Sequence, residues 1–187
     1  MESKIILASA SPRRKELMAQ IGLIFTVEPS DADENIGIED PEKLVAELSR
    51  IKADDVWQKH PEKCIIAADT VVSINGKILG KPSDRAESEQ MLKLLSGNKH
   101  TVYTGVTVQD EKGSLTEVSA TDVYFKELSQ TDIEKYLNTN EHADKAGAYG
   151  IQGYAARFVE KICGCYFNVV GLPLSLLDKM LTEKGVM

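Results

Sequence analysis

Two serines and two arginines follow an apolar run near the start of the chain. The run Ile5–Ala8 is typical of a buried strand, and the segment Ser9–Arg14 (SASPRR) comes directly after it. Ser11 suits the N-cap of a helix, and Pro12 suits its first position, where a missing N–H group costs nothing. The start of such a helix directs N–H groups and a positive dipole end toward anions, close to Arg13. The pattern predicts a phosphate site; a capped surface helix with solvated arginines is the alternative.

A carboxylate interrupts a second apolar run. Asp69 and Thr70 lie within Cys64–Ile74, a continuous apolar segment typical of a buried strand. An unpaired charge is costly there, so Asp69 needs a cationic partner such as Lys52 or Lys81, holds a metal ion, or acts as a general base. The alternative is that Asp69 ends the strand and caps the following turn.

A hairpin signal follows that strand. The pair Asn75-Gly76 predicts a type I′ turn with Lys77–Pro82 as the returning arm. Counting outward from the turn places Lys81 opposite Thr70 and one step from Asp69. The hairpin therefore predicts that a lysine lies near the buried carboxylate, although counting alone does not fix the face of the sheet on which it lies. The alternative is an exposed lysine before a turn proline, and the hairpin on its own favours that alternative.

An acidic loop and a glycine-rich segment complete the candidate residues. Glu34 belongs to the acidic stretch 31–34, whose oxygens suit a hard divalent cation, although such loops are more often solvated. Lys52 comes four residues after Leu48 on a predicted helix and borders its apolar stripe. The segment Asp144–Gly153, which carries Gln152, has three glycines in seven residues and is expected where backbone approaches another group closely.

The expected elements mix helices with hairpins and buried strands, which indicates an α/β or α+β fold with a mixed sheet. The chain has neither a phosphate loop ending in Lys-Ser/Thr nor a dinucleotide fingerprint, so those two nucleotide folds are excluded. Helices are expected to start at Ser11, Pro41, Asp84, Ser129 and Pro173, and further strands at Phe25–Glu28, Val102–Val108, Leu115–Phe125, Arg157–Ile162 and Tyr166–Val170.

Composition limits the class of protein. The chain has 187 residues, a net charge of −7 and three cysteines, which together argue for a cytoplasmic protein without a disulfide framework and against a general nucleic-acid binder. No apolar stretch approaches the roughly 20 residues of a membrane span, and no secretory leader is recognised. The oligomeric state is left open, and a homodimer is among the states allowed.

Five motifs in order carry a resemblance over essentially the whole chain. They are Ser9–Arg14, Ala68-Asp69-Thr70, Gly80-Lys81-Pro82, Asp144–Gly153 and Gly171-Leu172-Pro173-Leu174. Together they resemble the Maf family of nucleoside triphosphate pyrophosphatases, also described as septum-formation inhibitors. The resemblance implies one Maf-like domain over residues 1–187, two-lobed like the inosine triphosphate pyrophosphatases, with the active site in a cleft between the lobes.

The resemblance also implies roles for single residues. Asp69 matches the family's proton acceptor, and the other polar active-site positions are Glu34, Lys52 and Lys81. The positions that choose the base are Arg13, Thr70 and Gln152. The sequence Tyr-Gly-Ile-Gln-Gly is similar to the branch that acts on dTTP and UTP rather than on 7-methyl-GTP.

The mechanism expected from these residues is hydrolysis at the α-phosphorus, giving a nucleoside monophosphate and pyrophosphate. Glu34 and Asp69 would hold Mg²⁺ or Mn²⁺ while basic side chains cradle the triphosphate. Phosphate contacts are expected from Ser9, Ser11 and Arg14. Two alternatives remain, a 7-methyl-GTP type of pyrophosphatase and a non-catalytic nucleotide-binding regulator of cell division.

Overall fold

The computed structural model describes residues 4–186. The α-helices are α1 (Pro12–Gln20), α2 (Pro41–Lys59), α3 (Arg85–Leu95), α4 (Gln130–Leu137), α5 (Tyr166–Val170) and α6 (Leu174–Lys184). The strands are β1 (Ile5–Leu7), β2 (Phe25–Val27), β3 (Cys64–Ile74), β4 (Lys77–Leu79), β5 (Lys99–Asp110), β6 (Gly113–Phe125) and β7 (Val159–Cys163). Two 3₁₀ helices are η1 (Ala146–Ala148) and η2 (Tyr154–Phe158).

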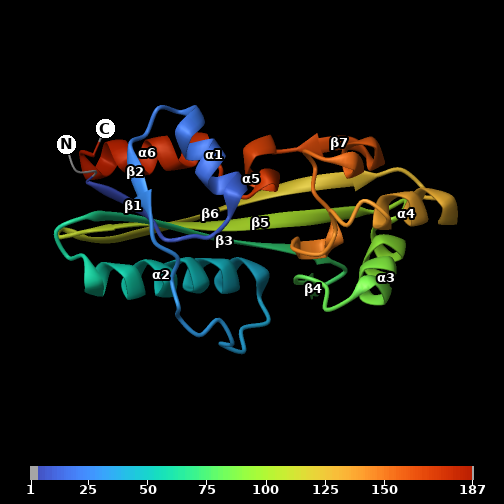
Figure 1. Cartoon of the computed structure of the whole chain (residues 1–187), viewed down its shortest axis with the longest axis horizontal. Coiled ribbons are helices and arrows are strands. Elements are labelled where there is room, and N and C mark those ends of the chain that lie inside the picture. Colours follow the sequence, from blue (N-terminus) through green and yellow to red (C-terminus); the bar gives the residue numbers. More distant parts are fainter. Residues whose placement is uncertain (1–3, 187) are drawn as a thin grey trace. The chain divides into compact units, whose positions relative to one another are not determined.

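The strands form a mixed sheet, as the alternation of buried runs and hairpins predicts. Its hydrogen-bonding order is β2-β1-β3-β5-β6-β7, with β4 also paired to β3. Strand β1 runs parallel to both β2 and β3, whereas β4 and β7 pair antiparallel with β3 and β6. The predicted α/β class with a mixed sheet is confirmed (Figure 1).

The chain divides into two compact units. The first contains Met1–Asp69, Thr104–Ser119 and Gly171–Met187, and the second contains Thr70–Tyr103 and Ala120–Val170. Strands β3, β5 and β6 contribute residues to both units, and the division within β3 falls between Asp69 and Thr70.

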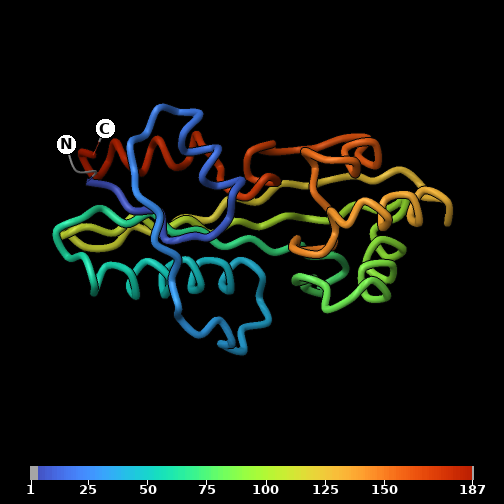
Figure 2. The backbone as a smooth tube through the Cα atoms, viewed as in Figure 1, coloured from blue at the N-terminus to red at the C-terminus, as the bar shows by residue number. Residues whose placement is uncertain are grey.

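In the first unit, helices cover both faces of the sheet, with α2 on one face and α1 and α6 on the other (Figure 1). The face under α2 is formed by alternate residues of β1 and β3, which pack with the helix in a cluster of Ile6, Ala8, Ala53, Val56, Ile65 and Ala67. Gly105 of β5 permits close approach of α2, since a Cβ there would overlap the carbonyl group of Val45. Between β2 and α2, residues 28–40 form a long irregular connection (Figure 2).

The second unit has an aromatic core. The rings of His100, Phe125 and Tyr149 meet edge to face, with centroids 4.9 Å apart for His100–Phe125 and for Phe125–Tyr149. His100 Nε2 and Tyr149 Oη are 2.8 Å apart. Because Tyr149 belongs to the glycine-rich segment, this core fixes the middle of that segment.

The predicted hairpin is confirmed but is short. Asn75 and Gly76 have φ angles of 51° and 75°, as a type I′ turn requires. The register pairs Ile74 with Lys77 and extends to Val72 with Leu79. The returning strand therefore stops before Gly80, and the pairing of Lys81 with Thr70 lies outside the hairpin.

The strand predicted at Tyr166–Val170 is wrong, because that segment is the helix α5. A run of aromatic and β-branched residues has high strand propensity, but a tertiary contact overrides it here. Asn168 is buried, and its amide donates to the carbonyl of Val102 at 2.9 Å and to Thr121 Oγ1 at 3.0 Å. The strand predicted at Arg157–Ile162 is shifted to β7, since η2 extends to Phe158.

Candidate functional site

The turn between β1 and α1 has the predicted cap. Ser11 is the N-cap of α1, its hydroxyl accepts from the Arg14 amide, and Pro12 occupies the first helical position. Ser9 Oγ, which is buried, accepts from the Ser11 amide at 3.2 Å and from Arg14 Nη1 at 3.1 Å. The two serines therefore shape the turn itself in addition to being candidate phosphate ligands.

The two neighbouring arginines have different surroundings. Arg14 Nε donates to the carbonyl of Gly171 at 2.9 Å, so its guanidinium connects the turn to the segment before α6. Burial lowers the pKa of Arg14, while the charge of Asp69 opposes that shift, and an arginine remains cationic throughout. Arg14 thus helps to shape the turn, as the two serines do, in addition to being a candidate phosphate ligand.

The parallel register brings this turn to the level of Asp69. Leu7 pairs with Ile66, and the Ala8 amide donates to the Ile66 carbonyl at 2.8 Å. The residues that follow β1, Ser9 among them, therefore run beside the part of β3 that leads to Asp69. Ligand sites of parallel sheets lie at this carboxyl end of the strands.

Asp69 is neutralised by Lys52, one of its two predicted partners. Lys52 Nζ lies 2.6 Å from Asp69 Oδ1, and the two side chains are 12% and 13% exposed. The same ammonium lies 3.0 Å from Glu34 Oε2. One cation thus joins a buried carboxylate to an exposed one, and we call Glu34, Lys52 and Asp69 the charged cluster.

The local sequence explains why these side chains meet. In β3, Ile65 and Ala67 face α2, so period-two alternation brings Asp69 to the same face. On α2, Lys52 precedes Ala53 and lies one turn before Val56, both of which are buried in the same interface. The predicted position of Lys52 at the border of the apolar stripe is confirmed.

The acidic connection has polar contacts with Asp55 and His60, in the last part of α2 and at its C-cap, and one contact within the loop itself. Asp55 Oδ2 accepts from the Asp31 amide at 3.0 Å, and Asp33 Oδ1 accepts from the Asn35 amide at 2.9 Å. Glu28 Oε2 lies 2.7 Å from His60 Nε2. These contacts define the path of the loop that presents Glu34.

A cluster of three or more acidic, histidine or cysteine side chains arranged for a metal ion is absent from residues 4–186. Two carboxylates nevertheless converge on one cation, since Glu34 and Asp69 share the Lys52 ammonium. Mg²⁺ in nucleotide sites commonly uses one or two carboxylates together with phosphate oxygens, so this donor set fits a substrate-bound cation.

The other predicted site residues belong to the second unit. Thr70 is half-buried in β3, whereas Lys81 and Gln152 are exposed on loops. The Gly147 amide donates to the Gly80 carbonyl at 3.0 Å, which joins the glycine-rich segment to the neighbour of Lys81. The structure thus places Lys81 and the segment that carries Gln152 on connected loops of one unit.

Each glycine of that segment lies against another group of the protein. The prediction that the backbone approaches another group closely is therefore met by contacts within the protein itself. An added Cβ would meet Val72 at Gly147, Lys145 at Gly150, and Glu141 at Gly153. The sequence did not predict that Glu141 and Lys145 pack against this segment. The only signal was the spacing of the glycines, which indicates neighbouring groups but does not identify them.

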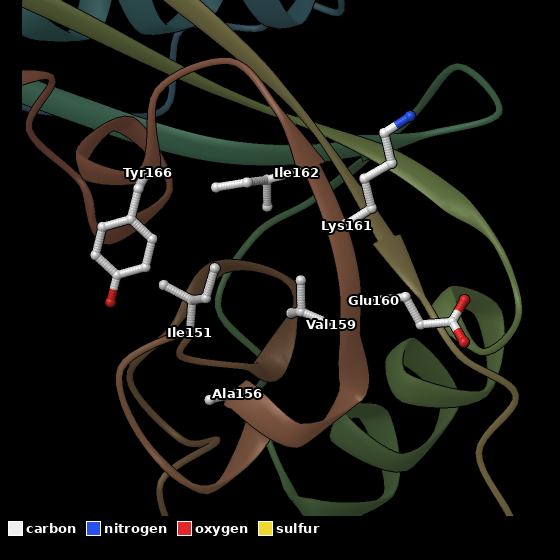
Figure 3. A pocket seen from close by; sticks show the side chains of 7 residues that line it. All are labelled: Ile151, Ala156, Val159, Glu160, Lys161, Ile162 and Tyr166. Carbon is white, nitrogen blue, oxygen red and sulfur yellow. The ribbon is translucent and has the colours of Figure 1, made fainter.

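A hollow of about 370 Å³ lies elsewhere in the second unit (Figure 3). Its lining is largely apolar and consists of Ile151, Ala156, Val159, Glu160, Lys161, Ile162 and Tyr166. Ile151 adjoins Gln152 in the chain, but none of the predicted site residues lines the hollow. We assign no function to it.

Comparisons with known proteins give the family. A dTTP/UTP pyrophosphatase of Carboxydothermus hydrogenoformans is 50% identical over 184 residues, covering 97% of this chain and 99% of the relative. One of Bacillus pumilus is 46% identical, with 98% of each chain covered.

Among solved structures, the Staphylococcus aureus Ham1 protein shares the fold with a TM-score of 0.57 at 12% identity, over 96% of this chain and 98% of that one. No helix within residues 4–186 is long and apolar enough to cross a membrane. The model of the family described as Maf-like protein matches residues 4–184, and the chain belongs to this family.

Proposed function

We propose that this chain hydrolyses nucleoside triphosphates, dTTP and UTP above all, to the nucleoside monophosphate and pyrophosphate. The observation that carries the proposal is the charged cluster beside the Ser9–Arg14 turn, where β1 ends and its parallel neighbour β3 continues through Asp69. A protein that only binds nucleotides has no need of a buried carboxylate there. The relatives that are about half identical over nearly the full chain carry the name dTTP/UTP pyrophosphatase.

In this proposal Asp69 is the proton acceptor that prepares a water molecule for attack on the α-phosphorus. Its Oδ1 accepts a hydrogen bond from Lys52 Nζ at 2.6 Å, which holds the carboxylate in place for the reaction. Lys52, Lys81 and Arg13 neutralise the triphosphate, and Ser9 and Ser11 supply hydroxyls at the turn. Positioning and charge neutralisation are the main requirements of phosphoryl transfer, which this set of side chains can meet.

Glu34 and Asp69 are the residues that would hold a divalent cation, Mg²⁺ or Mn²⁺, together with oxygens of the bound triphosphate. When bound, the cation supplies charge neutralisation at the reacting phosphate. Lys52 bridges the two carboxylates, so a cation shares them with this ammonium and needs phosphate oxygens of the nucleotide to complete its ligands. We therefore expect metal binding to depend on the nucleotide.

Choice of the base is assigned to Arg13, Thr70 and Gln152. The carboxamide of Gln152 offers one acceptor and two donors, which suits the edge of uracil or thymine. We further propose that the two units belong to one Maf-like domain, in keeping with a single family model that matches residues 4–184.

The test is a panel of nucleoside triphosphates assayed for pyrophosphate release with Mg²⁺, with Mn²⁺ and with excess chelator. We expect turnover of dTTP and UTP that is lost with chelator and restored by metal. A preference for 7-methyl-GTP would contradict the pyrimidine assignment. Absence of turnover with every nucleotide and metal would favour the non-catalytic regulator of cell division.

A further inference from the structure

The loop that carries Gln152 is held by a carboxylate from outside the glycine-rich segment. Glu141 Oε2 accepts from the Tyr154 amide at 2.8 Å. The same oxygen occupies the space into which any side chain at Gly153 would project. Glu141 therefore contacts the two residues that directly follow Gln152.

Glu141 is itself held in place. Its amide donates to Thr139 Oγ1 at 3.2 Å, and its carbonyl accepts from Lys145 Nζ at 2.6 Å. The stem of Lys145 in turn lies against Gly150, where an added Cβ would be 2.7 Å from Lys145 Cε. The segment 139–145 is thus linked by its own hydrogen bonds and contacts the loop at Gly150, Gly153 and Tyr154.

Gln152 has an anchored residue on either side. Ile151 is buried, at 9% exposure, and Gly153 lies against the Glu141 carboxylate, while Gln152 itself is exposed. With both neighbours held, the backbone at Gln152 has less freedom, which restricts the position from which its carboxamide reaches a ligand. Preorganisation of this kind lowers the entropic cost of binding a ligand.

We propose that Glu141 is a positioning residue that sets the preference for pyrimidine nucleotides by fixing the loop that presents Gln152. The inference rests on the proposed function, because it takes Gln152 to contact the base. It assigns Glu141 no contact with substrate. A carboxylate suits this role because its oxygen accepts strongly from the Tyr154 amide, and its small tip fits beside Gly153.

The experiment compares kcat and KM for dTTP, UTP and dGTP in the wild type, Glu141→Ala, Glu141→Gln, Gln152→Ala and the double variant Glu141→Ala/Gln152→Ala. Glu134→Ala is the matched control, since Glu134 is exposed on α4 and its carboxylate contacts Gln130 at 3.2 Å. Glu141→Gln keeps an acceptor oxygen for the Tyr154 amide. Hydrogen exchange at Tyr154 reports on the contact without relying on activity.

We expect Glu141→Ala to lower the ratio of kcat/KM for dTTP to that for dGTP about tenfold, through KM for the pyrimidines. Glu141→Gln and Glu134→Ala should stay within about twofold of the wild type, and Tyr154 should exchange faster only in Glu141→Ala. The double variant should discriminate no worse than Gln152→Ala, because both changes act on one contact.

The inference would be overturned if Glu141→Ala left the dTTP to dGTP ratio of kcat/KM unchanged, whether or not both values fell. It would also be overturned if the losses in this ratio from the two single changes multiplied in the double variant. A Glu141→Gln variant as impaired as Glu141→Ala would also overturn it. If the wild type turned over neither dTTP nor UTP, the proposed function itself would be wrong, and the proposed role of Glu141 in it would be wrong as well. A wild type that turns over dTTP with an unchanged ratio in Glu141→Ala would contradict only the role of Glu141.

Discussion

Lys52 Nζ lies 2.6 Å from Asp69 Oδ1, and neither side chain is more than 13% exposed. The pair joins the middle of α2 to β3, and Asp69 is the only charged residue of that strand. Removing one partner of such a pair leaves an uncompensated buried charge, which is far more damaging than removing a surface pair. The fold depends on this pair, and in the proposed function so does the chemistry.

We expect Lys52→Met to lower the free energy of unfolding by about 3 kcal/mol, because the aliphatic stem is kept while Asp69 loses its partner. Lys59→Met is the control on the same helix. Lys59 is 43% exposed and 3.5 Å from Asp55, so its loss should change stability by less than about 1 kcal/mol. Denaturant unfolding of both variants measures the difference, and equal effects would contradict a buried pair.

Asp69→Asn should lower kcat for dTTP by about 10²- to 10⁴-fold, because an amide keeps the shape but cannot accept the proton. The fold should be kept, because Lys52 still pairs with Glu34 when Asp69 loses its charge. Asp178→Asn, at an exposed position of α6, is the control and should retain full turnover. Steady-state kinetics and circular dichroism test this. Near-normal turnover in Asp69→Asn would exclude the residue as the base.

A pH dependence of stability is expected from His100. Burial lowers its pKa to about 4, so the unfolded chain takes up the proton first as the pH falls. The folded state therefore loses stability from about pH 6.5 down to about pH 4, by about 3 kcal/mol in total. His100→Phe is the comparison, because phenylalanine has no group that binds a proton in this range but keeps an aromatic ring beside Phe125 and Tyr149.

The measurement is the difference in free energy of unfolding between the wild type and His100→Phe at pH 7 and at pH 4. The wild type should lose about 3 kcal/mol more than the variant over that range. Parallel losses in the two proteins would show that His100 does not titrate as its burial requires.

Gly105→Ala should destabilise the protein by about 3 kcal/mol, because the new methyl group overlaps the backbone of α2 at Val45. Gly80→Ala is the matched control, since no atom lies within 4 Å of its added Cβ and its φ is not positive. Thermal or denaturant unfolding compares the two. A tolerated Gly105→Ala would mean that α2 can move away from β5 at little cost.

Local signals in the sequence predicted much of the fold. Ser11 and Pro12 marked the start of α1, and Asn75-Gly76 marked the turn of the hairpin, because each motif acts within four residues. The segment Tyr166–Val170 was predicted wrongly because Asn168 reaches residues far away in sequence, and no local rule contains that contact.

The charged cluster could be predicted in part. The sequence predicted that Asp69 needs a cationic partner and that Lys52 borders the apolar stripe of its helix. The choice between Lys52 and Lys81 as that partner required the tertiary structure. The hydrogen bond from Arg14 to Gly171 joins residues far apart in the sequence, so no local pattern predicts it. The contact of Glu141 with Gly153 and Tyr154 depends on the path of an irregular loop, which the residue types do not specify.

Hydrolysis of dTTP in water enriched in ¹⁸O tests the central proposal most directly, with mass spectrometry of both products. Attack on the α-phosphorus predicts thymidine monophosphate carrying one ¹⁸O atom and unlabelled pyrophosphate, with the rate lowered about 10²- to 10⁴-fold in Asp69→Asn. Label in the pyrophosphate, or release of thymidine diphosphate and inorganic phosphate, would contradict it.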